Sequence, residues 1–262
     1  MRATLVRKVV VDNTIMTNVN RGLVFSITQG GTISDVVLSN LVIDCNRFDW
    51  FWAGDGQPFY FRITRHSEWM RQAPKPGEPP AGSIRNVMIR NVIARGKGSS
   101  LVNGHPESWL DGLSFESVRL HMATDPTAPY DTAVNAMNFR WARNLKIRDL
   151  EVFWEKPALD KWESALHFED IEDLELDRFS GRPAWPEKDG PVLFFGNVTD
   201  AVIRETRALK GTKLFLQLTG KDSRNVVLQG NDFRSSATPY RLDSTVSKDA
   251  VSALDNLLPA KN

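Results

Sequence analysis

Apolar residues along this chain recur in a pattern that repeats about eight times. Within an eleven-residue segment they stand at offsets 0, 3, 5, 8 and 10, as in ISDVVLSNLVI at 33–43 and IRNVMIRNVIA at 84–94. The pairs at offsets 3 and 5 and at offsets 8 and 10 have the period of two that is typical of β-strands. The three-residue steps between the pairs indicate corners, so each segment predicts two short strands that meet at an angle.

The copies lie at regular distances from one another. Seven clear copies and a weaker eighth occupy 6–16, 33–43, 84–94, 110–120, 142–152, 171–181, 198–208 and 224–233. Apart from one gap of 51 residues they are spaced by 25 to 32 residues, and each interval holds one more strand-like run, such as PFYFRI or SALHFED. Three strands per repeat without helical periodicity predict an all-β fold, a single-stranded right-handed parallel β-helix of about eight rungs.

Two segments depart from the repeat. The long gap contains HSEWMRQAPKPGEPPAGS at 66–83, which is rich in Pro and Gly and predicts an insertion loop that projects from one rung. The repeat extends to about residue 236, so we expect a β-helix over 1–236 and a C-terminal tail or cap over 237–262. Within that tail, 246–258 has the pattern of a short amphipathic helix, which would cover the last rung.

Small polar residues stand at offset 7 of five copies: Asn13, Asn40, Asn91, Ser117 and Asp149. Offset 7 falls at a predicted corner, where such side chains can hydrogen-bond to backbone or to the neighbouring rung. We therefore interpret these residues as structural rather than catalytic.

Composition excludes several classes of function. Lys plus Arg number 33 against 32 for Asp plus Glu, a net charge of +1, which argues against nucleic acid as a partner. Cys45 is the only cysteine, and no cluster has the spacing of metal ligands, so we expect neither a metal nor another cofactor. No apolar run reaches the roughly 18 residues of a membrane span, and the chain as given carries no signal peptide. We therefore expect no membrane partner, and the compartment is left open.

Three stretches resemble one enzyme family. RGLVFSITQGGTISDVVLSNLVI, DWFWAGDGQPFYF and SIRNVMIRNVIARGKGSSLVNGHPESWLDGLSFESVRL, within Arg21 to Leu120, are similar to segments of glycoside hydrolase family 28, the polygalacturonase-like enzymes. The resemblance implies a parallel β-helix that hydrolyses glycosidic bonds of a pectin-like galacturonan or rhamnogalacturonan. It also implies an oligo- or polysaccharide as the partner, and an extracellular or periplasmic location for a longer parent protein.

The chain departs from that family where the chemistry lies. The family's Asn-Thr-Asp strand, Asp-Asp pair and Gly-His-Gly turn, which supply the two carboxyls of an inverting mechanism, do not occur here. Val24, Phe25 and Ser26 stand where the family has its cationic Arg-Ile-Lys contact. The alternative is therefore a non-catalytic β-helix module or truncated remnant that binds glycans without cleaving them. A lyase ranks last, because no Asp cluster for calcium is evident.

Strand alternation indicates which residues face outward. The outward set on the predicted groove strands is Tyr60, Arg62, Asn138, Arg140, His167 and Glu169. His167 and Glu169 share a face two residues apart, as either a catalytic acid–base pair or a solvated surface pair. Arg62 and Arg140 would hold sugar carboxylates.

Further candidates flank the groove. Arg65 and His66 stand at the root of the insertion, where an overhanging loop would bring them to a substrate. Trp50 and Trp52, in DWFWAGDG, are candidate platforms for sugar rings. The repeat also begins directly after Met1, so we expect self-association through an uncapped N-terminal rung.

Overall fold

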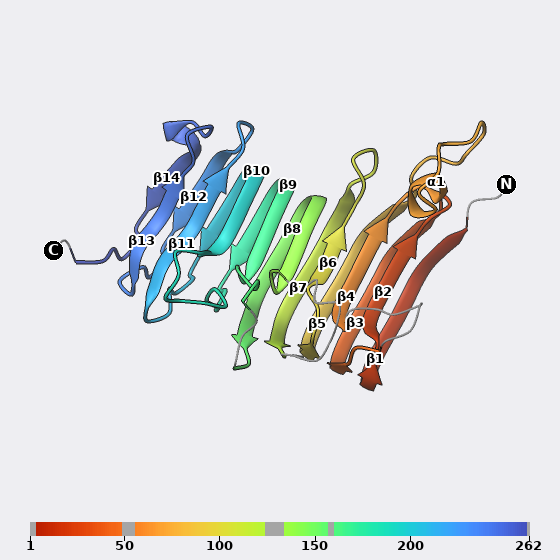
Figure 1. The fold of residues 1–262 in the computed structure, drawn as a ribbon, viewed down its shortest axis with the longest axis horizontal. Coiled ribbons are helices and arrows are strands. Elements are labelled where there is room, and N and C mark those ends of the chain that lie inside the picture. The colour runs from red at the N-terminus through yellow and green to blue at the C-terminus, as the bar shows by residue number, and fades with distance from the viewer. Residues whose placement is uncertain (1–3, 49–55, 124–133, 157–159, 261–262) are drawn as a thin grey trace.

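The structure is a computed structural model that describes residues 4–48, 56–123, 134–156 and 160–260. It contains almost exclusively parallel β-strands, which lie side by side from one end of the molecule to the other, with the two termini at opposite ends (Figure 1). The parallel β-helix predicted from the repeat is confirmed.

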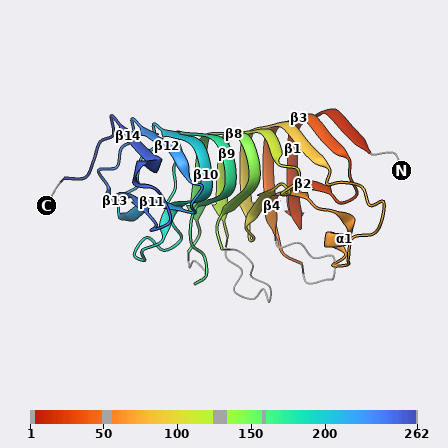
Figure 2. The same ribbon diagram turned by 90° about the horizontal axis from the view of Figure 1, so that it is seen from above.

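Two rows of strands form opposite sides of the coil (Figure 2). The first row is β2 (Arg21–Ile27), β4 (Gln57–Ile63), β6 (Ser100–Asn103), β8 (Met137–Trp154), β9 (Leu166–Asp177), β10 (Pro191–Arg204), β11 (Thr212–Thr219) and β13 (Ser236–Leu242). The second row is β1 (Leu5–Val19), β3 (Thr32–Cys45), β5 (Ser83–Gly96), β7 (Leu110–Met122), the later parts of β8, β9 and β10, then β12 (Arg224–Gln229) and β14 (Val251–Leu254). The first row carries the predicted groove residues.

The corners of the second row confirm the structural interpretation of offset 7. All five residues at that offset have left-handed backbone, with φ between 50° and 56°, a conformation that Asn and Asp tolerate better than other residues with a Cβ. Asn40 Nδ2 donates to Asp12 Oδ1 (2.8 Å), and Asn91 Nδ2 donates to Asn40 Oδ1 (3.1 Å). A second left-handed corner lies at offset 2, as at Asp35 and Asn86.

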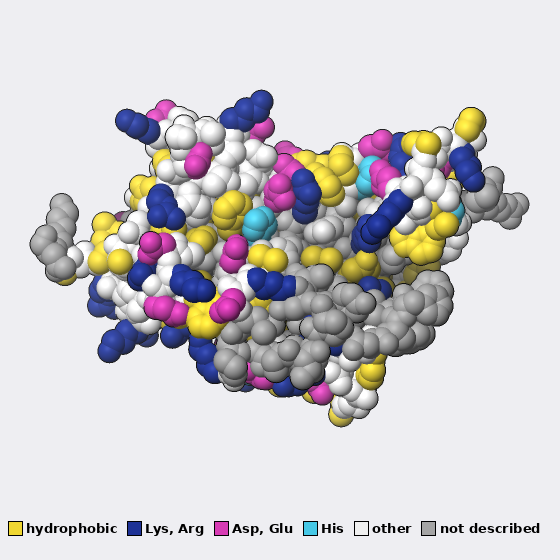
Figure 3. All heavy atoms as spheres, in the orientation of Figure 1, with side chains coloured by type: hydrophobic (Ala, Val, Ile, Leu, Met, Phe, Trp, Pro, Cys, Tyr) yellow, Lys and Arg dark blue, Asp and Glu magenta, His cyan; other side chains and the backbone are white. Residues whose placement is uncertain are grey.

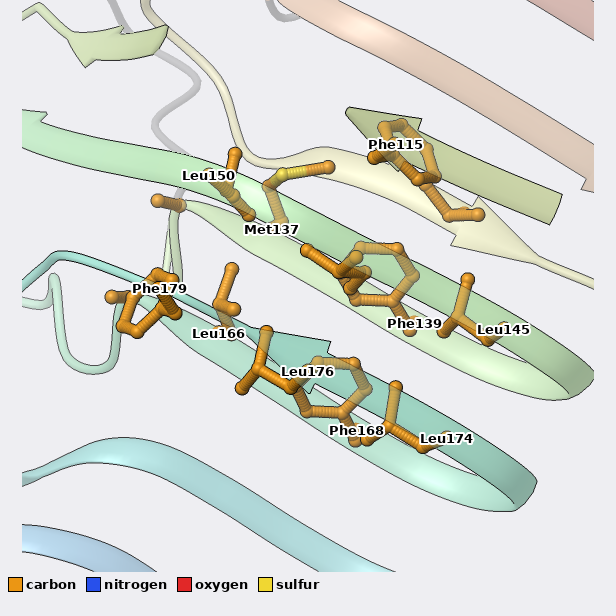
Figure 4. Packing of buried hydrophobic residues seen from close by; sticks show 14 of the residues in the cluster. Phe115, Met137, Phe139, Leu145, Leu150, Leu166, Phe168, Leu174, Leu176 and Phe179 are labelled. Atoms are coloured by element: carbon orange, nitrogen blue, oxygen red, sulfur yellow. The ribbon is translucent and has the colours of Figure 1, made fainter. Parts of the chain in front are cut away.

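Phenylalanine and leucine side chains from successive rungs stack in the space between the two rows (Figure 4). The rings of Phe139 and Phe168 are nearly parallel at 4.9 Å, and Phe195 meets Phe168 edge-on at 5.2 Å. These three residues are fully buried, as are Leu145 and Leu174. Because each rung repeats the inward positions of the previous one, the core is continuous along the coil.

The C-terminal segment differs from the expected amphipathic helix. Only Lys248–Ala250 forms a 3₁₀ turn, and β14 then pairs with β12 while β13 pairs with β11. Val251 and Ala253 fall in register with Val226 and Leu228, so the alternation of a rung strand continues here. Val251 packs against the core, and its two-residue spacing from Ala253 matches the period of a strand rather than that of a helix.

The connection from the first row to the second changes along the coil. After β2, β4 and β6 it takes residues 28–31, 64–82 and 104–109, the second of which contains helix α1 (His66–Trp69). In β8, β9 and β10 the strand passes the same corner through one left-handed residue: Trp141, Asp170 or Asn197. The chain therefore leaves the first row through loops after β4 and β6. In the next rung, β8, it turns the corner within the strand at Trp141.

β1 pairs with β3 alone among the described strands. Val10 and Ile15 on it are 70% and 72% exposed. Self-association through this rung stays a prediction.

Candidate functional site

The strand register aligns outward residues of the first row into two continuous lines. The first line is Val24, Tyr60, Leu101, Asn138, His167, Phe194, Gln217 and Arg241. The second line is Ser26, Arg62, Asn103, Arg140, Glu169, Gly196 and Thr219. Six of the predicted site residues thus lie on one face, on which cations, carboxylates and histidines are interspersed (Figure 3).

His167 lies in the middle of this face and packs on its neighbour in the first line. Its ring stacks nearly parallel on that of Phe194, with centroids 4.4 Å apart. Burial, and secondarily the charge of Arg140, lower the pKa of His167 from its ordinary value. His167 and Glu169 share the face but form no hydrogen bond with each other in the part of the chain that the structure describes. Their catalytic role stays a prediction.

Arg140 is held by carboxylates of the next rung. Its Nε lies 3.3 Å from Glu169 Oε2 and 3.6 Å from Asp170 Oδ2, and its guanidinium stacks on the ring of Trp141 at 4.0 Å. The positive charge of Arg140 is therefore balanced within the protein. The pairing involves Nε, which makes no hydrogen bond among the described residues, so it balances the charge of Arg140 by proximity.

Arg62 has a different environment. Its Nη1 donates to the hydroxyl of Tyr60 (3.3 Å), and no carboxylate of the described residues pairs with it. Tyr60 points outward as expected, but it is only 8% exposed because the guanidinium of Arg21 covers its ring at 4.2 Å. The prediction of an exposed Tyr60 is thus corrected. Of the two arginines in the second line, Arg62 is the one without a carboxylate partner among the described residues.

A cleft of about 460 Å³ opens beside Arg62. Its walls are Phe61, Arg62, Ile63, Thr64, Glu68, Leu101, Asn103, Gly104, His105, Pro106 and Trp141. Two buried polar atoms of this lining, Thr64 Oγ1 and Asn103 Oδ1, have no hydrogen-bond partner among the described residues. A buried polar group without a partner costs about 1–3 kcal/mol, so a hydrogen bond from a bound molecule would be a gain.

The root of the insertion is fastened to the turn at 104–109. The carboxylate of Glu107 pairs with the Arg65 guanidinium, whose Nε lies at 3.1 Å, and His105 Nε2 donates to Glu68 Oε1 at 2.9 Å. The backbone N–H of Glu107 donates to His105 Nδ1, which assigns the imidazole proton to Nε2. Burial raises the pKa of Glu68, but the hydrogen bonds from His105 and from the Arg65 backbone outweigh it, so the net shift is downward.

Two more predicted site residues have partners of their own. His66 lies on the insertion, with Nδ1 3.4 Å from Gln29 Nε2 and its ring 6.0 Å from that of Trp69. Asn138 Oδ1 accepts from Asn135 Nδ2 (2.9 Å). Trp50 and Trp52 lie outside the described residues.

Thr64, Asn103 and Trp141 of the cleft and Phe194 of the first line were not among the predicted site residues. Asn103 occupies the position of Arg62 and Arg140 in its own rung, so an alignment of the first-row strands would have found it. Thr64 follows its strand, and nothing in the repeat marks it.

The described residues contain no group of three or more His, Cys, Asp or Glu side chains that could hold a metal ion. Among the described helices, none is long and apolar enough to cross a membrane.

Comparisons with known proteins leave the family open. No family model matches the chain, and no curated protein matches it. Among solved structures it is similar to the surface protein and adhesin PfbA of Streptococcus pneumoniae, with 11% identity over 95% of this chain and 82% of that chain and a TM-score of 0.32. The likeness is too distant to assign a function, and membership of glycoside hydrolase family 28 is not shown.

Proposed function

We propose that this β-helix binds an oligo- or polysaccharide along its first row of strands without cleaving it. The observation that carries the proposal is the stacked pair of His167 and Phe194, flanked in the same line by the amides of Asn138 and Gln217. The two stacked rings turn their outer edges toward the groove as an apolar strip against which the C–H groups of a sugar can pack, and the amides on either side can bond to its hydroxyls. The resemblance to polygalacturonase-like enzymes favours a pectin-like polymer as the glycan.

Hydrolysis, the activity that the resemblance implies, has weaker support from the geometry. It requires two carboxyls on either side of the scissile bond, one of them protonated. Glu169 and Asp170 both lie within ion-pair distance of Arg140. At the cleft, Glu68 and Glu107 are engaged with His105 and Arg65. The carboxylates on this face therefore serve ion pairs and hydrogen bonds.

The test is titration calorimetry with oligogalacturonates and neutral galactan oligosaccharides, together with an assay of released reducing sugar. We expect binding without release. Replacing the aromatic platform in Phe194→Ser should weaken binding about tenfold, the equivalent of about 1.4 kcal/mol for a lost aromatic contact.

The chain offers a matched control. Phe153 stacks on His121 with almost the same geometry, 4.8 Å and 16°, at the far end of β8 and outside both lines. Phe153→Ser should leave affinity unchanged. Failure of all these glycans to bind would contradict the proposal, and steady release of reducing sugar would favour the hydrolase instead.

A further inference from the structure

The two arginines of the second line differ in charge balance. Arg140 has Glu169 and Asp170 as partners, whereas Arg62 lies in register between Ser26 and Asn103. Neither neighbour of Arg62 is acidic, and its hydrogen bond goes to the neutral hydroxyl of Tyr60. Arg62 therefore has no carboxylate within ion-pair distance among the described residues, and the lining carboxylate of Glu68 is hydrogen-bonded to His105 instead.

The remaining cleft lining suits a polar ligand of limited size. Thr64 is 7% exposed and Asn103 is half-buried, and each has a polar atom without a partner in the described structure. Hydroxyl groups can both donate to Asn103 Oδ1 and bond to Thr64 Oγ1. The ring of Trp141 and the side chain of Leu101 supply apolar wall. Polar and apolar side chains thus both line the cleft, which suits a sugar ring with hydroxyls at its rim and C–H groups on its faces.

The wall that contains Glu68 and His105 is held in place. Two links across more than 35 residues of sequence, Glu68 to His105 and Arg65 to Glu107, join the insertion to the 104–109 turn. A ligand in the cleft would thus meet a preformed wall, which reduces the entropy lost on binding.

We propose that this cleft is a subsite for one sugar residue that carries a negative group, a carboxylate or a sulfate, with Arg62 as its charge partner. The proposal rests on the proposed glycan-binding function and deepens it. In this proposal the preference for a negatively charged sugar depends on residues of β4 and its neighbour β6. Val24 and Ser26 on β2, where the resemblance to family 28 implies cationic contacts, carry no charge.

The test compares affinities for three oligosaccharides of equal length: an oligogalacturonate, a sulfated galactan fragment and a neutral galactan fragment. We expect at least one acidic ligand to bind about tenfold more tightly than the neutral one at low salt. The two acidic arms identify the anion, because a carboxylate and a sulfate differ in geometry. Arg62→Gln should abolish the preference, and Arg62→Lys should retain part of it.

Arg119→Gln is the matched control, since Arg119 is an exposed arginine paired with Glu151 on the second row. It should leave the preference intact. Circular dichroism would show that each variant is folded. Equal affinity for acidic and neutral ligands, or an unchanged preference in Arg62→Gln, would overturn the inference while leaving glycan binding in place. Absence of all binding would instead contradict the proposed function.

Thr64→Val separates a ligand-binding role from a structural one. Valine keeps the shape of threonine and removes a hydroxyl that has no partner in the described structure. We expect an unchanged or higher Tm together with a severalfold loss of affinity for the acidic ligand. An unchanged affinity, or a lower Tm, would contradict the assignment of this hydroxyl to the ligand.

Discussion

Charged residues on the second row of strands are arranged differently from those in the groove. There, Lys146 Nζ lies 3.3 Å from Glu175, and Arg178 forms two hydrogen bonds with Asp149 at 2.7 and 2.9 Å. The network also contains Arg148, Asp177, Arg204 and Glu205. Each of its four cations has at least one carboxylate within 4 Å.

The register explains the difference. On the second row, Lys146 lies opposite Glu175, and Arg148 lies opposite Asp177, so side chains of opposite sign face each other across the rungs. In the groove, the neighbours of Arg62 are a serine and an asparagine. Paired charges hold neighbouring rungs together, and an unpaired charge beside a cleft is available to a ligand. We therefore expect substitutions on the second row to change stability and substitutions in the groove of the first row to change ligand binding.

The largest effect is expected in the core that both faces share. Phe168 is fully buried and contacts the rings of Phe139 and Phe195. Phe168→Ala should lower the free energy of unfolding by about 3–5 kcal/mol, because it leaves a cavity that the stacked rungs cannot close. Urea denaturation measures this change. A loss below about 1 kcal/mol would show that neighbouring rungs can collapse into the space.

The corner of the second row should affect stability alone. Asn40 has φ of 56° and hydrogen-bonds to Asp12 and Asn91. Asn40→Ala should cost about 1–3 kcal/mol through left-handed strain and lost hydrogen bonds, and glycan affinity should not change.

Asn40→Gly distinguishes the two causes, since glycine accepts this φ without strain. It should cost less than the alanine variant. Equal losses in both variants would assign the whole effect to the hydrogen bonds.

Most of the fold was predictable, because it depends on local alternation. The inward positions of β9 and the left-handed corners at offset 7 follow from the period of apolar residues and from the preference of Asn and Asp for turns. The register of Arg140 with Glu169 also follows from the repeat, because each residue stands two positions before its copy at 142–152 or 171–181. The sequence does not show that the two side chains reach each other, which depends on the backbone conformation at the corner.

The cleft was beyond sequence reasoning for a related reason. Thr64 and Asn103 line one site because the wide connection that begins at Thr64, the turn at 104–109 and the tight corner at Trp141 belong to successive rungs. Corner width is a property of the backbone, and the apolar repeat does not encode it.

The pH dependence of stability should report the burial of His167. Its pKa is lowered in the folded protein, so between that value and the ordinary value of 6.5 the unfolded chain binds more protons than the folded one. Stability should therefore fall as the pH drops below about 6.5. Between pH 7.5 and 5.5 the Tm of His167→Gln should fall less than that of the wild type, as measured by thermal unfolding. If stability falls equally with pH in the wild type and in His167→Gln, the pH dependence does not come from His167.

The smallest effect, and the sharpest test of the paired groove arginine, is expected from Glu169→Gln. This change removes one of the two carboxylates that balance Arg140. Both side chains are about 40% exposed, so the pair is worth at most about 1 kcal/mol, and its release should strengthen binding of an acidic oligosaccharide by up to about fivefold. Affinity for a neutral oligosaccharide should not change.

The hydrolase hypothesis predicts the opposite outcome for the same variant. If Glu169 were a catalytic carboxylate, Glu169→Gln would abolish release of reducing sugar from a substrate that the wild type cleaves. If it only balances Arg140, the variant gains affinity for acidic ligands and the wild type releases no sugar. We expect Glu169→Gln to raise the affinity for an acidic oligosaccharide and Arg62→Gln to lower it. Together these results would show that an arginine of the second line can bind an acidic ligand only when no carboxylate of the protein is paired with it.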